Sequence, residues 1–214
     1  DAARSRATHD FGTAGGFAAV QEEATPPERV GPFRVGRLLG RGGMGSVYEG
    51  ERDDGLFEQR VAIKLLSIRH WSKALEESLA SERRILARLE HRNIARLFDG
   101  GASADGRSYI VMERIDGLPI TEHAQRHSLG LTARVRLFAQ LCAALQYAHQ
   151  QLVVHADLKP SNVLVTDDGS VKLLDFGIAA LLDRDAAGAP TDGASRPMTR
   201  AYAPPERAAG DPPT

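Results

Sequence analysis

The sequence predicts an α+β fold, because apolar runs typical of hairpin strands occur together with two stretches at helical spacing. Turn residues at 53–55 separate short apolar runs, and this spacing is typical of hairpins. Leucines at positions 75, 79, 86 and 89, and apolar residues at 137, 138, 141 and 145, recur at helical spacing. Each set predicts a helix, and Thr132 is a candidate cap for the second one.

The composition excludes several classes of protein. The 214 residues include 27 basic and 28 acidic side chains, a balance that indicates neither a nucleic-acid surface nor a polybasic membrane surface. The single cysteine, Cys142, cannot form a disulfide or zinc framework within the chain, and its apolar neighbours predict that it is buried in the second helix. This cysteine content is compatible with a reducing, cytoplasmic location.

The two ends of the chain carry separate expectations. Residues 1–32 lack hydrophobic periodicity and predict a flexible tail, and the strand pattern begins at Phe33. The chain starts with neither Met nor a signal peptide, and it contains no apolar run long enough to span a membrane. We therefore expect a fragment, and a membrane anchor beyond Thr214 is an open alternative.

The most specific chemical signal is the string HADLKPSN at residues 155–162, which is followed by DFG at residues 175–177. Apolar runs on either side of residues 167–170 predict a hairpin that brings the two motifs together. Transfer of a γ-phosphoryl group requires one carboxylate that orients the attacking hydroxyl, and an amide and a second carboxylate that hold Mg²⁺. Asp157 fits the first role, and Asn162 and Asp175 fit the second. Each motif alone occurs in ordinary turns, but their combination favours a catalytic site.

A glycine-rich segment at residues 40–47 fits the pattern G-x-G-x-x-G-x-V. In dinucleotide-binding folds such a pattern leads into a helix, whereas here it leads to a turn and a second apolar run. Glycines allow the backbone to approach phosphate oxygens, and Lys64 at the end of that run is placed to meet the α- and β-phosphates. The alternative for Lys64 is a solvated lysine at a strand end.

Glu82 lies inside the leucine stripe of the first predicted helix. An acid on an apolar stripe is costly to bury without a partner, which makes Glu82 the candidate ion-pair partner of Lys64. Glu76 and Glu77 lie off the stripe and are interpreted as solvated charges. A Glu82 that reaches water at the edge of the stripe is the alternative.

Together these motifs resemble bacterial Ser/Thr protein kinases of the eukaryotic-like (Hanks) type, between residue 33 and the YAPPE segment at 202–206. The resemblance implies a bilobal fold, with residues 33–112 as the N-lobe and residues 113–214 as the hinge and a C-lobe truncated after the activation segment. It also implies that Lys159 contacts the transferred phosphate and favours Ser/Thr acceptors.

The nucleotide site is likewise implied by the resemblance, with ATP and Mg²⁺ as cofactors and Mn²⁺ as a substitute metal. Met112 would be the gatekeeper of an adenine pocket between the lobes, and Glu113 and Ile115 would offer hinge backbone groups. The other implied cofactor contacts are Leu39, Gly40, Gly42, Gly43, Gly45, Val47, Ala62, Lys64, Glu82 and Leu164. A regulatory spine of Leu86, Leu97, His155 and Phe176 belongs to the same resemblance.

The chain departs from the family pattern at three places. Ala156 stands where most of these kinases carry the Arg that pairs with an activation-loop phosphate, so that switch cannot operate in its usual form. Pro204 replaces an Ala, which we expect to be tolerated, and the chain stops at Thr214, where the family continues with more helices. In and directly after the loop at residues 183–197, Thr191, Ser195 and Thr199 are candidate phosphoacceptors. Thr199 also resembles the family's substrate-docking threonine, which is the role we favour for it.

We interpret the chain as the catalytic region of a Ser/Thr protein kinase that acts on protein hydroxyls, with autophosphorylation as an additional reaction. A small-molecule kinase of the aminoglycoside type is the second candidate, because it too has a small residue before the catalytic Asp. A pseudokinase that binds nucleotide or partners without catalysis is the third. The segment through Glu206 argues against the second candidate, and the presence of all the chemical residues argues against the third.

Overall fold

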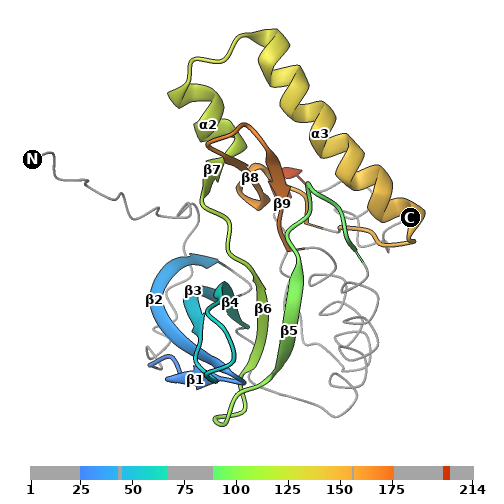
Figure 1. Ribbon diagram of the computed structural model, residues 1–214. Helices are drawn as coiled ribbons and strands as arrows, with labels where there is room; N and C mark the ends of the chain where they lie inside the picture. The colour runs from blue at the N-terminus through green and yellow to red at the C-terminus, as the bar shows by residue number, and fades with distance from the viewer. Residues whose placement is uncertain (1–24, 43–44, 67–88, 156, 176–199, 203–214) are drawn as a thin grey trace, which may run out of the picture. The chain divides into compact units, whose positions relative to one another are not determined.

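The computed structural model describes residues 25–42, 45–66, 89–155, 157–175 and 200–202 (Figure 1). The chain divides into two compact units: the first comprises Asp1–Trp71 and Asp99–Arg114, and the second comprises Ser72–Phe98 and Ile115–Thr214. The first unit contains an antiparallel sheet, and the second combines helices with a small sheet. The predicted α+β class is confirmed.

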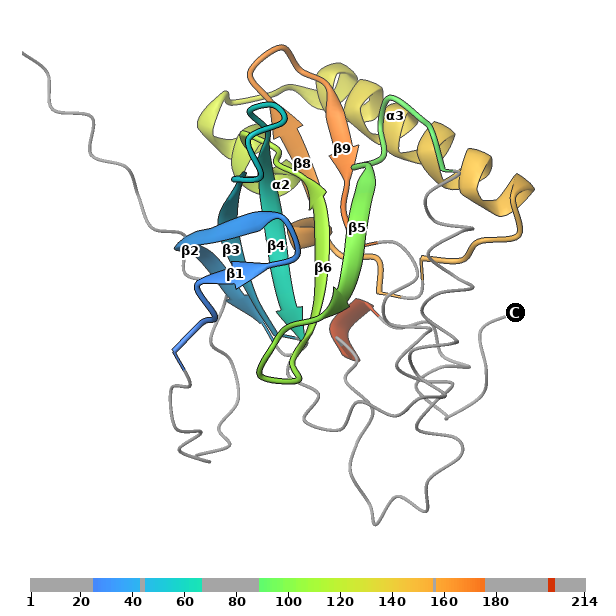
Figure 2. The same cartoon turned by 60° about the horizontal axis from the view of Figure 1, so that its bottom comes forward.

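The first unit is built on a six-stranded sheet with the strand order β1-β2-β3-β4-β6-β5 (Figure 2). The strands from β1 to β4 are antiparallel neighbours, and β4 pairs antiparallel with β6. The predicted turn at 53–55 lies between β3 and β4, where Gly55 has a φ of 76°. The strands are β1 (Arg29–Val30), β2 (Phe33–Gly42), β3 (Gly45–Arg52), β4 (Arg60–Leu66), β5 (Leu97–Ala102) and β6 (Ser108–Glu113).

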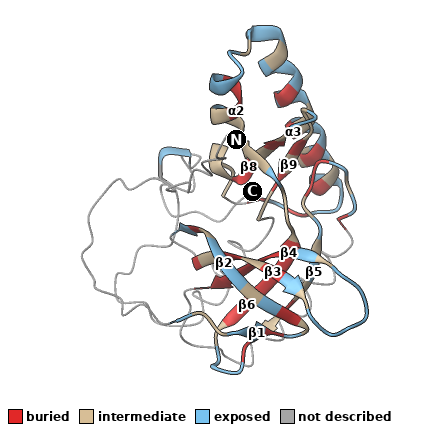
Figure 3. Ribbon diagram, turned by 60° about the vertical axis from the view of Figure 1, so that its left-hand side comes forward, coloured by how far each residue is buried: buried red, intermediate tan, exposed pale blue. Residues whose placement is uncertain are grey.

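One face of this sheet carries an apolar core. Tyr48, Ile63 and Val111 are cross-strand neighbours on β3, β4 and β6, and all three are buried. Figure 3 shows the buried stretches of these strands in red. Because successive side chains of a strand alternate between faces, the residues one position away point to the other side of the sheet. The core consists of Val30, Phe33, Tyr48, Val61, Ile63, Leu65, Tyr109 and Val111.

The sheet begins at Arg29, before the start of the strand pattern at Phe33. Val30 pairs with Phe33 and is buried, and the Val35 amide donates a hydrogen bond to the Glu28 carbonyl oxygen (2.8 Å). The boundary of the predicted tail at residue 32 is therefore too late. Val30 is a single apolar residue followed by Gly31 and Pro32, so it gives no periodic signal in the sequence. Its place in the sheet follows from its pairing with Phe33 and its burial in the folded chain.

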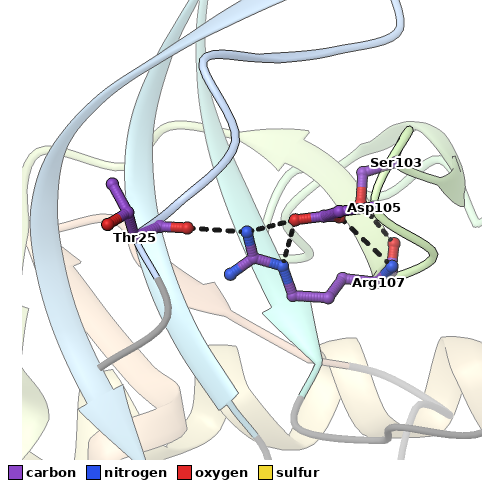
Figure 4. A network of polar contacts seen from close by, with 4 residues as sticks. All are labelled: Thr25, Ser103, Asp105 and Arg107. Carbon is purple, nitrogen blue, oxygen red and sulfur yellow. Dashed lines mark hydrogen bonds and ion pairs between the residues drawn. The ribbon is translucent and has the colours of Figure 1, made fainter. Parts of the chain in front are cut away.

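A polar network joins residue 25 to the turn between β5 and β6 (Figure 4). The Arg107 guanidinium donates to the Thr25 carbonyl oxygen (2.7 Å) through Nη2 and to the Asp105 carboxylate (2.7 Å) through Nε. The Arg107 side chain and the Ser103 hydroxyl lower the pKa of Asp105 to about 2. Asp105 therefore stays ionised at any physiological pH.

Among its described residues, the second unit contains two helices and a three-stranded sheet with the order β7-β8-β9. Val163 pairs with Leu173 and Val165 with Val171, which confirms the hairpin predicted around residues 167–170. The elements are β7 (Gly117–Pro119), α2 (Ile120–Arg126), α3 (Leu131–Gln150), the 3-10 turn η1 (Pro160–Asn162), β8 (Val163–Thr166), β9 (Val171–Leu173) and the 3-10 turn η2 (Arg200–Tyr202).

Helix α3 buries one stripe, formed by Leu137, Leu141, Ala144 and Ala148. Cys142 is exposed, so the prediction that it is buried is wrong. It follows Leu141 by one residue, which turns it about 100° away from the buried stripe. The proposed Thr132 cap is also wrong, because the helix begins at Leu131 after Gly130 and has no side-chain cap.

Two side-chain amides, those of Asn93 and Gln140, form hydrogen bonds to the β8–β9 hairpin. Asn93 Nδ2 donates to the Val171 carbonyl oxygen (2.7 Å) and to Gln140 Oε1 (3.1 Å) on α3. Gln140 in turn bonds the Val171 amide (3.0 Å) and the Gly169 carbonyl oxygen (3.1 Å). This network fixes the start of β9, the strand that leads into Leu174 and Asp175. Among the described residues, no helix has both the length and the apolarity to cross a membrane.

Candidate active site

In the first unit, the predicted nucleotide contacts share the face of the sheet opposite the core. Val47 pairs with Lys64, and Ala62 pairs with Met112. On β4, Ala62 and Lys64 alternate with the buried Ile63, so they point away from the core. The structure thus brings Val47, Ala62, Lys64 and Met112 together on one surface.

The glycine-rich segment forms the hairpin between β2 and β3. Gly40 pairs with Val47 and Gly42 with Gly45. Gly45 has a φ of 141°, and a Cβ there would lie 2.0 Å from the Leu65 carbonyl oxygen, so only glycine fits. Leu39 precedes Gly40 on β2, whereas Gly43 lies outside the described residues.

Lys64 is only 5% exposed, so it is not a solvated lysine at a strand end. A buried ammonium is costly unless it is paired or binds an anion, which is the environment required of a phosphate-binding lysine. Its candidate partner Glu82 lies outside the described residues, as do the helix around it, Ala156, Phe176 and the loop with Thr191, Ser195 and Thr199.

In the second unit, the catalytic string forms a compact loop. Lys159 Nζ lies 2.7 Å from Asp157 Oδ2, and their side chains are 25% and 10% exposed. Asn162 Nδ2 donates to the Asp157 carbonyl oxygen (2.8 Å), and the Asn162 amide donates to the Lys159 carbonyl oxygen (3.0 Å). The loop therefore places a carboxylate and an ammonium side by side, and Asn162 hydrogen-bonds to the backbone carbonyl of each of these two residues.

Asp175 is joined to this loop through its preceding residue. The Leu174 amide donates to the Asn162 carbonyl oxygen (2.8 Å), and His155 Nε2 donates to the Leu174 carbonyl oxygen (2.7 Å). Asp175 itself has a φ of 58°, in the left-handed region that non-glycine residues seldom adopt. The structure thus brings Asp157, Lys159, Asn162 and Asp175 together, and it holds Asp175 in an unusual backbone conformation.

These residues fit a Mg²⁺ ion. The Asp157 carbonyl can only accept a hydrogen bond, so Asn162 must direct its NH₂ group toward it, which leaves Oδ1 as the ligating atom. An amide oxygen and the Asp175 carboxylate are hard oxygen donors of the kind that Mg²⁺ prefers. Within the described part of the chain, no cluster of three or more acidic, His or Cys side chains forms a metal site. Mg²⁺ commonly takes its further oxygens from phosphate or water.

His155 is a buried residue of this site whose role the motif alone does not reveal. Burial lowers the pKa of His155, against the opposing effects of the Leu174 carbonyl and the nearby Asp175 and Asp157 carboxylates. A neutral ring with its proton on Nε2 satisfies the Leu174 bond and leaves Nδ1 as an acceptor facing the Asp157 amide (3.4 Å). The neutral His155 ring therefore links the two motifs through its hydrogen bond to the Leu174 carbonyl oxygen.

We expect His155 to make stability pH-dependent. Because its folded-state pKa lies below the ordinary value of 6.5, the unfolded chain takes up more protons below that pH, and stability falls as the pH drops below about 6.5. Urea unfolding at pH 7.5 and 5.5 should show a smaller acid-induced loss for His155→Gln than for the parent protein. The exposed His149 provides a matched control, since His149→Gln should leave the loss unchanged. Equal losses in all three proteins would contradict the role given to His155.

The remaining predicted contacts lie in different units. Glu113 ends β6 in the first unit, whereas Ile115 and Leu164 belong to the second unit. Leu164 is on β8, where it pairs with Pro119 and Lys172. Asn93 and Gln140 are not predicted from the sequence, because nothing near them in the chain marks them: Gln140 lies in an apolar stretch, whereas Asn93 follows Arg92.

A sheet with a glycine hairpin and a buried lysine, and a loop that joins an Asp–Lys pair to a second Asp, define a protein kinase domain. The family described as "Protein kinase domain" matches residues 33–212, and the chain belongs to this family. The solved structure of a mutant of the Mycobacterium tuberculosis PknI kinase domain is similar with a TM-score of 0.64 and 30% identity, over 89% of this chain and 70% of that chain.

Curated relatives point to the same bacterial group. The serine/threonine-protein kinase Pkn1 of Myxococcus xanthus is 41% identical over 80% of this chain and 25% of its own length. The serine/threonine-protein kinase PknA of Mycobacterium tuberculosis is 38% identical over 84% of this chain and 42% of its own length. The resemblance to bacterial Ser/Thr kinases is confirmed, and the chain spans less than half the length of these relatives.

Proposed function

We propose that this chain is the catalytic region of a Ser/Thr protein kinase that transfers the γ-phosphoryl group of ATP to hydroxyls of protein substrates, including its own. The observation that supports this most directly is the Lys159–Asp157 pair at 2.7 Å, which is tied through Asn162 and Leu174 to Asp175. The names of the relatives support the Ser/Thr class.

Each residue of the loop has a proposed role. Asp157 orients the acceptor hydroxyl and takes its proton, and Lys159 neutralises charge on the transferred group. Asn162 and Asp175 hold Mg²⁺, with Mn²⁺ as a substitute, and the bound metal neutralises charge on the phosphates. Catalysis then depends on positioning and electrostatics rather than on a covalent intermediate.

Each predicted nucleotide contact also has a role in this proposal. Lys64, with Glu82 as its partner, holds the α- and β-phosphates, and the glycine hairpin from Gly40 to Gly45 offers backbone amides to phosphate oxygens. Leu39, Val47, Ala62, Met112 and Leu164 contact the adenine, and Glu113 and Ile115 bond to it through their backbone groups. Since the reaction consumes ATP, we place it in the cytoplasm.

The test is a transfer assay with γ-labelled ATP, Mg²⁺ and a generic acceptor protein. We expect label in the acceptor and in the chain itself, and acid hydrolysis should release phosphoserine and phosphothreonine without phosphotyrosine. Transfer to an aminoglycoside but not to protein would identify the small-molecule kinase instead. Nucleotide binding without any transfer, in a protein that melts cooperatively, would identify a pseudokinase.

A further inference from the structure

An ion-pair cluster in the first unit links three separate segments of the chain. Glu49 on β3 accepts a hydrogen bond from Arg37 Nε of β2 (2.8 Å) through Oε2 and one from Arg114 Nη1 through Oε1. Arg114 directly follows the last residue of β6 and is the final residue of the first unit. The cluster therefore fastens the end of this unit to two strands of its sheet.

The register of the sheet places this cluster beside the predicted adenine contacts. Glu49 is the cross-strand partner of Ala62, and Ala62 is the partner of Met112. Cross-strand partners share a face of the sheet, so the Glu49 side chain lies on the surface that also carries Ala62, Met112 and Lys64. Arg114 stands between Glu113 and Ile115, whose backbone groups are the proposed bonding groups for adenine.

The partial burial of the Glu49–Arg114 pair distinguishes it from exposed ion pairs of the same sheet. The Arg114 and Glu49 side chains are 14% and 26% exposed. By contrast, Glu51 on β3 pairs with Arg34 of β2 (2.8 Å), and these side chains are 49% and 62% exposed. Exposed pairs contribute little, whereas pairs shielded from water interact more strongly. The Glu49–Arg114 pair is thus able to fix a backbone position.

We propose that Glu49 and Arg114 are a positioning pair for the adenine base. By holding the Arg114 side chain, Glu49 fixes the backbone on either side of it, where Glu113 and Ile115 bond to the base. The pair itself does not contact the phosphates or the metal. This inference rests on the proposed function, since it assumes that the chain binds an adenine nucleotide.

Calorimetric titration with metal-free adenosine and with Mg-ATP tests the inference. Arg114→Ala and Glu49→Gln should each raise the Kd of both ligands by the same factor, roughly 3- to 10-fold, because the lost contact acts on the base that the two ligands share. The double variant should be no weaker than the worse single variant by more than about twofold, since the residues act as one unit. In the transfer assay, KM for ATP should rise while kcat is retained.

Two controls separate positioning from damage to the fold. Glu51→Gln removes an exposed β2–β3 ion pair of the same sheet and should leave both Kd values unchanged. Arg114→Lys keeps a charge that can reach Glu49 and should recover most of the affinity. Unchanged Kd values in Arg114→Ala, or a loss confined to Mg-ATP, would overturn the positioning role alone. A parent protein that binds neither ligand would overturn the proposed function with it.

Discussion

Replacement of Asp157 by Asn is expected to reduce phosphotransfer by roughly 10²- to 10⁴-fold, the range for loss of a positioned acid–base group. The carboxylate is nearly buried and is held by the Lys159 ammonium at 2.7 Å, so it is oriented before any substrate arrives. An amide of the same shape keeps the loop intact but cannot take up the hydroxyl proton. Single-turnover assays with γ-labelled ATP measure the loss, and the Kd of Mg-ATP should stay nearly the same.

A matched acid elsewhere on the same unit gives the control for Asp157. Asp167 lies in the exposed turn between β8 and β9, and Asp167→Asn should leave the transfer rate unchanged. If Asp157→Asn transferred phosphate at the parental rate, Asp157 would have no part in the chemistry, and the proposed role of Lys159 beside it would fail as well.

The second large effect is expected for Asp175→Gly. Since the carboxylate is proposed to act through the metal, this variant should lose most of its affinity for Mg-ATP and keep its affinity for metal-free adenosine. Glycine accepts the φ of 58° at this position, so the backbone needs no rearrangement. Calorimetry with the two ligands measures the difference.

The pattern across ligands decides what the Asp175 result means. An equal loss for Mg-ATP and adenosine would show that the variant disturbs the fold and would remove the evidence for a metal role. Arg114→Ala provides the opposite pattern, because it should weaken both ligands alike. The two variants together therefore assign one residue to the metal and the other to the base.

The sequence predicts those parts of the fold and the site that are formed by residues close together along the chain. The turn residues at 53–55 between two apolar runs predict a hairpin, and the antiparallel register of β3 with β4, from Gly45 with Leu66 to Glu51 with Arg60, confirms it. The apolar runs around residues 167–170 predict the β8–β9 hairpin for the same reason. In both cases, period-two alternation and turn residues are contained in a short stretch of chain.

The contacts that the sequence does not predict join distant segments. Asn93 and Gln140 are 47 positions apart, and Glu49 and Arg114 are 65 positions apart. No periodicity relates such residues, because only the folded chain brings them together. Cys142 shows a second limit: one residue along a helix separates a buried position from an exposed one, so a small error of phase reverses the prediction.

At position 175 the residue that favours stability differs from the residue that activity needs, because the backbone there is left-handed. A non-glycine residue in this conformation costs roughly 1 kcal/mol, somewhat less for Asp than for most residues, and glycine removes that cost together with the carboxylate. A random library sorted for expression level or heat resistance alone would therefore enrich an inactive protein at this codon. Sorting for phosphate transfer would retain the less stable aspartate, so the choice of screen decides which residue survives.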